Sequence, residues 1–184
     1  MAERFDGRES TPPVINLGEA HYMRLAMEQA GIAQSAGEVP VGAVIVDAQG
    51  EVIAQGSNSV LTLSDPTAHA EIVALRRAGQ VLGNYRLPGL SVYVTLEPCV
   101  MCLGALFHAR VSRVIYGAPD PKTGACGGRV DLTAPGLINH HCTVEGGLLA
   151  QECGQILTGF FRDRRLAQAA ARASQNRIRH EQEK

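Results

Sequence analysis

Two short motifs constrain what this chain can fold into more than any other feature. His69-Ala70-Glu71 places an imidazole two residues from a carboxylate, and Pro98-Cys99-Val100-Met101-Cys102 places two thiols three residues apart. Imidazole and thiolate are zinc ligands, and a zinc with three protein ligands keeps its fourth position for water, whereas a fourth protein ligand makes the metal structural. The motifs therefore predict one zinc held by His69, Cys99 and Cys102, and a fold that brings them together.

Glu71 is placed to move protons and not to bind the metal. Two residues beyond His69 on a helix, its side chain points in a different direction from the imidazole. A zinc-bound water has its pKa lowered from roughly 16 to about 7.

Proline is favoured at the first helical position, and Pro66 and Pro98 stand near the starts of the two predicted helices. We therefore expect two positive helix ends to face the metal and favour thiolates.

Length and cysteine usage indicate one domain in a reducing compartment. A chain of 184 residues is long enough to bury a single core. Its five cysteines are an odd number and include a C-x2-C pair, which does not suggest a disulfide framework. The sequence shows no apolar signal and no membrane-length segment, so we expect a cytoplasmic protein without a membrane partner. Residues 1–16 lack periodicity and are predicted to form a flexible leader.

The basic charge is concentrated near the end of the chain. The formal net charge is only −1, yet six arginines and one aspartate lie between Arg162 and Arg179. A basic helical tail on a neutral or acidic body suits a polyanionic partner. A solvated helix end without a partner explains the same charge pattern, so both interpretations stay open.

Hydrophobic periodicity and turn residues predict an α/β fold with a sheet of five strands, partly antiparallel through its first hairpin. The helices are predicted at 23–30, ended by Gly31, and at 66–79, 98–110 and from 149 to beyond 166. The strands are predicted at 39–46, 51–55, 90–96, 111–116 and 142–146. Residues 117–141 contain many Gly and Pro residues and are predicted to form a long functional loop.

Several longer segments resemble the bacterial tRNA adenosine deaminases over about residues 18–165. They are Asp65-Pro66-Thr67-Ala68-His69-Ala70-Glu71, Asn84-Tyr85-Arg86-Leu87, Thr95-Leu96-Glu97-Pro98-Cys99-Val100-Met101-Cys102, Asp120-Pro121-Lys122-Thr123-Gly124-Ala125 and Phe160-Phe161-Arg162-Asp163-Arg164-Arg165. The H-x-E and P-C-x-x-C motifs among them are a signature of zinc-dependent nucleobase deaminases. The resemblance implies a three-layer α/β/α cytidine-deaminase-like fold with a mixed five-stranded sheet. It also implies a homodimer that hydrolyses adenosine to inosine at the wobble position of a tRNA anticodon.

The resemblance also implies roles for single residues and a division of the chain. His69, Cys99 and Cys102 would bind one zinc per subunit, and Glu71 would be the general acid and base. Contacts with the flipped nucleotide or the anticodon stem-loop would come from Asn58, Asp120, Phe161, Arg162, Arg164 and Arg165. Residues 17–166 would form the zinc deaminase domain between the leader and a basic helical tail, 167–184.

Other interpretations of the same residues stay open. The chain also fits a deaminase of a free base or nucleoside, of guanine or cytosine type, or a nucleic-acid-binding module with a structural zinc. His140 or His141 would close the metal site if either supplied a fourth ligand. Asn58 and Asp120 are common loop and turn residues. Small buried side chains are the simplest interpretation of Cys126, Cys142 and Cys153.

Overall fold

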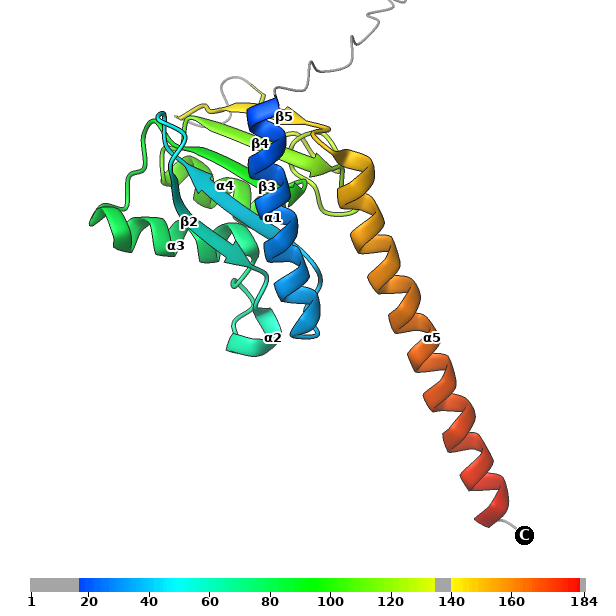
Figure 1. Ribbon diagram of the computed structural model, residues 1–184. Helices are drawn as coiled ribbons and strands as arrows, with labels where there is room; N and C mark the ends of the chain where they lie inside the picture. The colour runs from blue at the N-terminus through cyan, green and yellow to red at the C-terminus, as the bar shows by residue number, and fades with distance from the viewer. Residues whose placement is uncertain (1–16, 135–139, 183–184) are drawn as a thin grey trace, which may run out of the picture.

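The computed structural model describes residues 17–134 and 140–182 and arranges them in three layers (Figure 1). The central layer is a five-stranded sheet in the order β2-β1-β3-β4-β5. Its strands are β1 (Gly42–Val46), β2 (Val52–Ser57), β3 (Ser91–Leu96), β4 (Arg113–Ala118) and β5 (Thr143–Gly146). The predicted leader, 1–16, lies outside the described residues.

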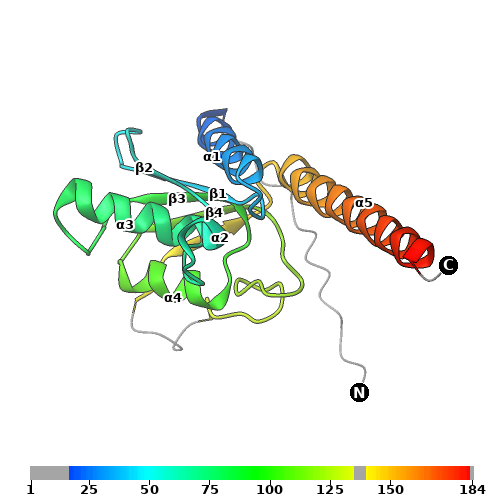
Figure 2. The same ribbon diagram turned by 90° about the horizontal axis from the view of Figure 1, so that it is seen from below.

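Helices cover both faces of this sheet. They are α1 (Leu17–Ser35), α2 (Val60–Leu63), α3 (Ala70–Leu82), α4 (Val100–His108) and α5 (Ala150–Gln182). Seen along the sheet, α1 and α5 lie on one side and α3 and α4 on the other (Figure 2). The predicted α/β/α architecture is therefore confirmed. Within the described residues, no helix combines the length and apolarity needed to cross a bilayer.

The sheet is mixed, and its directions decide where the loops gather. β1 runs antiparallel to both β2 and β3, whereas β4 runs parallel to β3 and to β5. It follows that β2, β3 and β4 all point the same way and end at the same edge of the sheet. The segments that leave these three strands, together with the segment that enters β1, meet at this edge.

The continuous apolar run of β1 reflects burial of both faces of the strand. Ala43 and Ile45 pack into the core beneath α3 and α4, while Val44 and Val46 pack into the second core beneath α1 and α5. A strand covered on both faces needs no polar residue at alternate positions. The expected hairpin and the parallel pairing of the later strands are both confirmed.

The predicted boundaries of three helices were wrong. α1 continues through Gly31 to Ser35, and the chain turns away only where Gly37 adopts a φ of +77°. α3 begins at Ala70, four residues after Pro66, and α4 begins at Val100, so neither Pro66 nor Pro98 is the first helical residue. Pro66 lies in a turn in which the Asp65 carboxylate accepts hydrogen bonds from the Thr67 N–H and hydroxyl, at 2.8 and 2.7 Å.

The close approach of α1 to β1 predicts that Gly42 tolerates no side chain. A Cβ at Gly42 would overlap the Ala26 carbonyl oxygen and the Ala30 nitrogen, whereas a Cβ at Gly31 would meet nothing within 4 Å. Gly42→Ala should lower the free energy of unfolding by about 1–3 kcal/mol through overpacking. Gly31→Ala should raise it by about 0.5–1 kcal/mol through helix propensity. Urea denaturation checks both, and equal shifts for the two variants would contradict the packing.

Candidate active site

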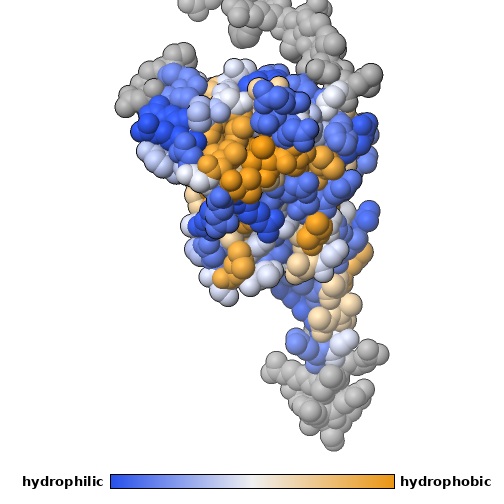
Figure 3. All heavy atoms as spheres, turned by 60° about the vertical axis from the view of Figure 1, so that its left-hand side comes forward, coloured by the Kyte–Doolittle hydropathy of each residue, from blue (hydrophilic) through white to orange (hydrophobic). Residues whose placement is uncertain are grey.

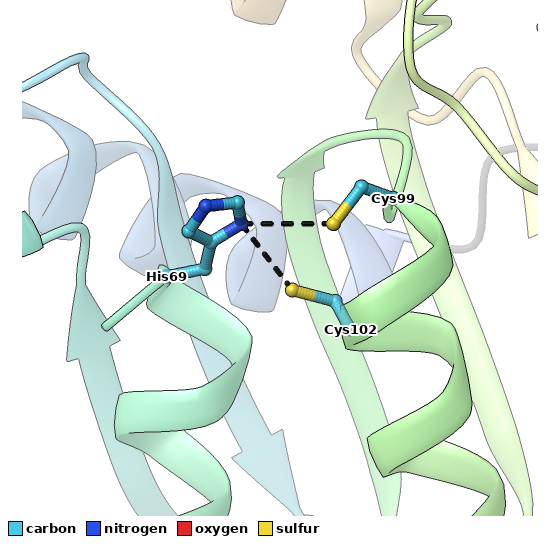
Figure 4. Close-up of side chains that lie close together, drawn as sticks. All are labelled: His69, Cys99 and Cys102. Atoms are coloured by element: carbon cyan, nitrogen blue, oxygen red, sulfur yellow. Dashed lines mark hydrogen bonds between the residues drawn. The ribbon is translucent and has the colours of Figure 1, made fainter. Parts of the chain in front are cut away.

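The fold brings the imidazole and the two thiols together at the sheet edge where β2 and β3 end. His69 Nδ1 lies 3.7 Å from Cys99 Sγ and 3.5 Å from Cys102 Sγ, and the three atoms all lie within 4.8 Å of one another (Figure 4). Zn–N and Zn–S bonds of about 2.05 and 2.3 Å in a tetrahedron place nitrogen and sulfur roughly 3.6 Å apart. The donor types and their separations therefore fit a zinc ion.

Two of the three ligands occupy helix N-caps. His69 is the N-cap of α3 and Cys99 is the N-cap of α4, both with extended backbone and neither with a side-chain capping hydrogen bond. Cys102 follows in the first turn of α4. The two capping side chains thus lie at the metal site, and both positive helix ends face it, as the sequence predicted.

Proton sharing between the two thiols favours one thiolate. A hydrogen bond from Cys102, followed by a contribution from His69, lowers the pKa of Cys99 to about 4. The same hydrogen bond and burial raise the pKa of Cys102 above its ordinary value. The hydrogen bond with Cys99 also raises the pKa of His69. Because a metal binds thiolate and neutral imidazole, its binding must release these protons and weakens as the pH falls.

The described residues supply three ligands and no fourth. The cluster of potential ligand atoms contains only His69, Cys99 and Cys102 among residues 17–134 and 140–182. His140 lies elsewhere, where its Nε2 is 3.1 Å from the Val111 carbonyl oxygen, and His141 is exposed. The alternative of a metal site closed by one of these histidines is therefore wrong for the described chain, and the site has the open form typical of catalytic zinc.

Glu71 lies in the first turn of α3, beside the ligands. Its residue is 4% exposed and lines the same cavity as His69 and Cys99. Burial raises the pKa of the Glu71 carboxyl above its ordinary value, and the nearby His69 partly opposes that shift. A carboxyl with a raised pKa gives and accepts a proton more readily near neutral pH.

A cavity of about 310 Å³ opens beside the ligands. Its size is at the lower end of the range for small-molecule sites. Four of its lining residues carry carboxylates, namely Glu38, Glu71, Glu97 and Asp120. The basic side chains on its wall are His69 and Arg164, and apolar side chains come from Val39, Val41, Val60, Leu61 and Leu96. The cavity therefore combines an apolar wall with several hydrogen-bond acceptors.

Three of the predicted RNA-contacting residues lie at this cavity. Asn58 is 8% exposed and follows β2, Asp120 follows β4, and Arg164 reaches the cavity from α5. Partial burial opposes ionisation of Asp120, but hydrogen bonds from the Thr123 hydroxyl and from the Lys122 and Thr123 N–H groups keep its pKa below its ordinary value. Asp120 is thus both a turn residue and part of the cavity wall.

The other three lie outside the cavity, on the exposed surface of α5. The ring centroid of Phe161 is 5.4 Å from that of Phe160, and Arg162 forms a 3.1 Å ion pair with Asp163. Arg165 is exposed as well. The helical repeat explains the difference, because Cys153, Leu157, Phe160 and Arg164 follow one another at intervals of three or four residues and share one face. This spacing was the signal that separates Arg164 from its neighbours.

Sequence reasoning missed Glu97, which anchors a wall of the cavity. The residue is 3% exposed, and its carboxylate accepts hydrogen bonds of 2.8 Å from the backbone N–H groups of Asp120, Cys126 and Gly128. A Cβ at Gly128 or at Gly124 would overlap this carboxylate. Glu97 therefore ties the loop after β4 to the turn that carries Cys99. A glutamate at the end of an apolar strand was the available signal, since buried charges are rarely left unpaired.

The remaining cysteines belong to the packing of the two cores. Cys153 on α5 is buried against the α1 side of the sheet. Cys126 and Cys142 are half-buried and pack against the core beneath α3 and α4. Burial raises the pKa of Cys126 to about 12 and that of Cys153 to about 11. Such thiols are small packing groups and poor nucleophiles at neutral pH.

Comparisons with known proteins agree with this geometry. The zinc-binding region of the cytidine and deoxycytidylate deaminases matches residues 18–118. A tRNA-specific adenosine deaminase of Haemophilus influenzae is 50% identical over 143 residues, which cover 78% of this chain and 83% of that relative. A solved structure from a study of A-to-I editing by tRNA:A34 deaminases at the wobble position of transfer RNA is 45% identical with a TM-score of 0.69. That match covers 74% of this chain and 99% of that chain.

A guanine deaminase from Nitrosomonas europaea shares the fold. Its structure is 24% identical, has a TM-score of 0.69 and covers 86% of this chain and 98% of that chain. The fold alone therefore does not separate an RNA substrate from a free base.

The three hydrogen bonds to Glu97 predict a specific loss of order. Glu97→Gln should lower the free energy of unfolding by about 1–3 kcal/mol, because an amide places N–H groups against buried N–H donors. Amide hydrogen exchange at Asp120, Cys126 and Gly128 should speed up. The matched control is Glu145→Gln, which removes an exposed ion pair with Arg113 and should shift stability by no more than about 0.5 kcal/mol. Unchanged exchange at the three amides would contradict the anchoring role.

Proposed function

Because the chain belongs to the tRNA-specific adenosine deaminases, we propose that it hydrolyses adenosine to inosine at the wobble position of a tRNA anticodon. The observation that carries this proposal is the convergence of His69, Cys99 and Cys102 on one open metal position beside the buried Glu71. The 50% identity to the Haemophilus influenzae relative supports the choice of substrate.

The reaction replaces the C6 amino group of adenosine with oxygen from water. When bound by His69, Cys99 and Cys102, zinc supplies Lewis acidity that lowers the pKa of a water at its open position. Glu71 takes the proton of the attacking water and delivers it to N1 of the purine, while the water oxygen bonds to C6. Glu71 then takes the remaining proton from the oxygen now bonded to C6 and passes it to the amino group, so that the C6–O bond becomes a carbonyl, the C6–N bond breaks and ammonia leaves. Inosine and ammonia account for all atoms of adenosine and water.

Entry into the cavity requires the base to leave its stack. An anticodon loop is single-stranded, which lowers the cost of extruding a base. Asn58 lies on the cavity wall and supplies an amide for hydrogen bonds to the nucleotide. Arg164, which also lines the cavity, is proposed to contact a phosphate next to the extruded nucleotide. Phe161, Arg162 and Arg165 extend along the exposed face of α5 and are proposed to contact the stem-loop outside the cavity.

A homodimer is part of the proposal, with the second copy on the α3 and α4 side. A groove of about 810 Å³ runs between these helices and is lined by Ile72, Leu75, Leu87, Ala105 and Ala109, among others. Val81 and Leu82 on α3 are exposed as well. Figure 3 shows an apolar surface on the side of the molecule where α3 lies. An apolar surface of this kind is typical of an interface between subunits.

The division of the chain and its location follow from the same proposal. Residues 17–166 would form the deaminase unit and 167–184 a basic tail, of which 167–182 belong to α5. A thiolate-bound zinc and a tRNA substrate both suit the reducing cytoplasm.

The function is tested by inosine formation in an anticodon stem-loop. Wild-type protein should convert the wobble adenosine and leave free adenosine, guanine and cytidine unchanged. Glu71→Gln should keep one zinc per chain yet lower turnover by about 10²–10⁴-fold, because the amide transfers no proton. Activity on a free base but not on the stem-loop would instead assign the chain to the free-base deaminases. A zinc-loaded protein inactive on every substrate would favour a structural metal.

The position of Arg164 on the cavity wall predicts a larger effect of its substitution than of substitution at its neighbour Arg162. Arg164→Ala should raise KM for the stem-loop about fivefold to tenfold. It should also reduce the slope of log binding constant against log salt concentration by about one. Arg162→Ala is the matched control, because Arg162 lies two residues away, pairs with Asp163 and does not line the cavity. Equal effects of the two substitutions would indicate diffuse attraction by α5 and contradict a phosphate contact at the cavity mouth.

A further inference from the structure

We propose that Glu38 reads the ribose 2′-hydroxyl of the target nucleotide and thereby restricts the cavity to RNA. The inference rests on the proposed function and adds a specificity-determining residue to it. Glu38 lies in the segment that enters β1, at the sheet edge where β2, β3 and β4 end. Its residue is 1% exposed, and it lines the same cavity as His69 and Glu71.

One oxygen of the Glu38 carboxylate is held in place by α2. Oε1 accepts hydrogen bonds from the Thr62 N–H at 2.7 Å and from the Thr62 hydroxyl at 3.0 Å. These two bonds fix the orientation of the side chain, and they tie Glu38 to a helix whose Leu61 is 66% exposed. Leu61 also lines the cavity, so Glu38 and this exposed helix belong to the same part of the cavity wall.

The second oxygen is available to a ligand. Both hydrogen bonds to the Glu38 carboxylate from the described residues end at Oε1, and none reaches Oε2. In the described chain, every side-chain oxygen or nitrogen that is fully enclosed has a hydrogen-bond partner. Oε2 is therefore not fully enclosed, and because Glu38 lines the cavity, a ligand in the cavity is the group that can reach it. A carboxylate oxygen accepts hydrogen bonds and donates none, so its ligand must present a donor.

The chemistry of an RNA strand leaves one such donor outside the base. The 3′ and 5′ oxygens of an internal nucleotide are esterified, so the ribose keeps only its 2′-hydroxyl as a donor. The amino-bearing edge of the base must lie at the metal ligands and Glu71, so it is not free to donate to Glu38. The negative charge of Glu38 also disfavours a phosphate at this position, which leaves the phosphates to Arg164. The 2′-hydroxyl is therefore the group that fits Glu38.

The test measures kcat/KM for stem-loops that differ only at the 2′ position of the target adenosine. Wild-type protein should prefer 2′-hydroxyl over 2′-hydrogen by about tenfold or more, as expected for a hydrogen bond to a charged acceptor. A 2′-fluorine, which accepts but does not donate, should be no better than hydrogen. In Glu38→Gln the preference should fall to within about threefold, because Gln holds Thr62 through its carbonyl oxygen and loses the accepting oxygen.

Thr62→Val is the control for a purely structural role. It removes the hydroxyl bond to Oε1 while Glu38 keeps its charge, so the 2′-hydroxyl preference should persist even if activity falls. Should Glu38→Gln slow all three stem-loops by the same factor, Glu38 serves only to hold α2 and the inference is overturned. A wild-type protein that accepts the 2′-deoxy stem-loop as well as RNA overturns it without any variant. Absence of inosine in the all-RNA stem-loop would overturn the proposed function itself.

Discussion

The whole site depends on two helix N-termini meeting at one point. His69 and Cys99 cap α3 and α4, and the caps lie close enough for one metal because the strands that precede them run in the same direction. β2 and β3 are both antiparallel to the strand between them, so both end at the same sheet edge. The positive ends of the two helices then add at the metal and favour the thiolate that it needs. A change of direction in either strand would separate the ligands by the length of the sheet.

The same edge explains why the functional residues come from distant parts of the sequence. Asn58 follows β2, Glu97 follows β3, Asp120 follows β4, and Glu38 precedes β1. The three buried glutamates of this edge differ by their partners. Glu97 is fully engaged by three backbone N–H groups, Glu38 keeps one oxygen for the cavity, and Glu71 has a pKa raised by burial. Because the three residues are of one type, their surroundings account for the difference between them: Glu97 anchors a loop, whereas Glu38 is proposed to recognise the ribose and Glu71 to transfer protons.

The metal ligands could be predicted from sequence because their signal is local. The spacing of His69 and Glu71, and of Cys99 and Cys102, carries the chemistry within a few residues. The anchoring by Glu97 could not be predicted, because it depends on a loop that returns to β3 from more than twenty residues away. The starts of α3 and α4 were misplaced for a similar reason, since Pro66 lies in a turn before α3 and Pro98 lies in the short segment between β3 and α4. The arginines of α5 lie on different faces of the helix. Which of them reaches the cavity could be decided only once the buried face of α5 was known.

The most direct test of the account is X-ray absorption spectroscopy at the zinc edge of the purified, zinc-loaded protein. Three ligands from two helix caps and one helical turn predict two sulfur scatterers at about 2.3 Å and two nitrogen or oxygen scatterers at about 2.0–2.1 Å. One of the light scatterers should be His69 and the other an exchangeable oxygen, so the second should change when a competing anion is added. A shell of three or four sulfurs, or a second histidine that no anion displaces, would mean a closed structural site and would contradict the account.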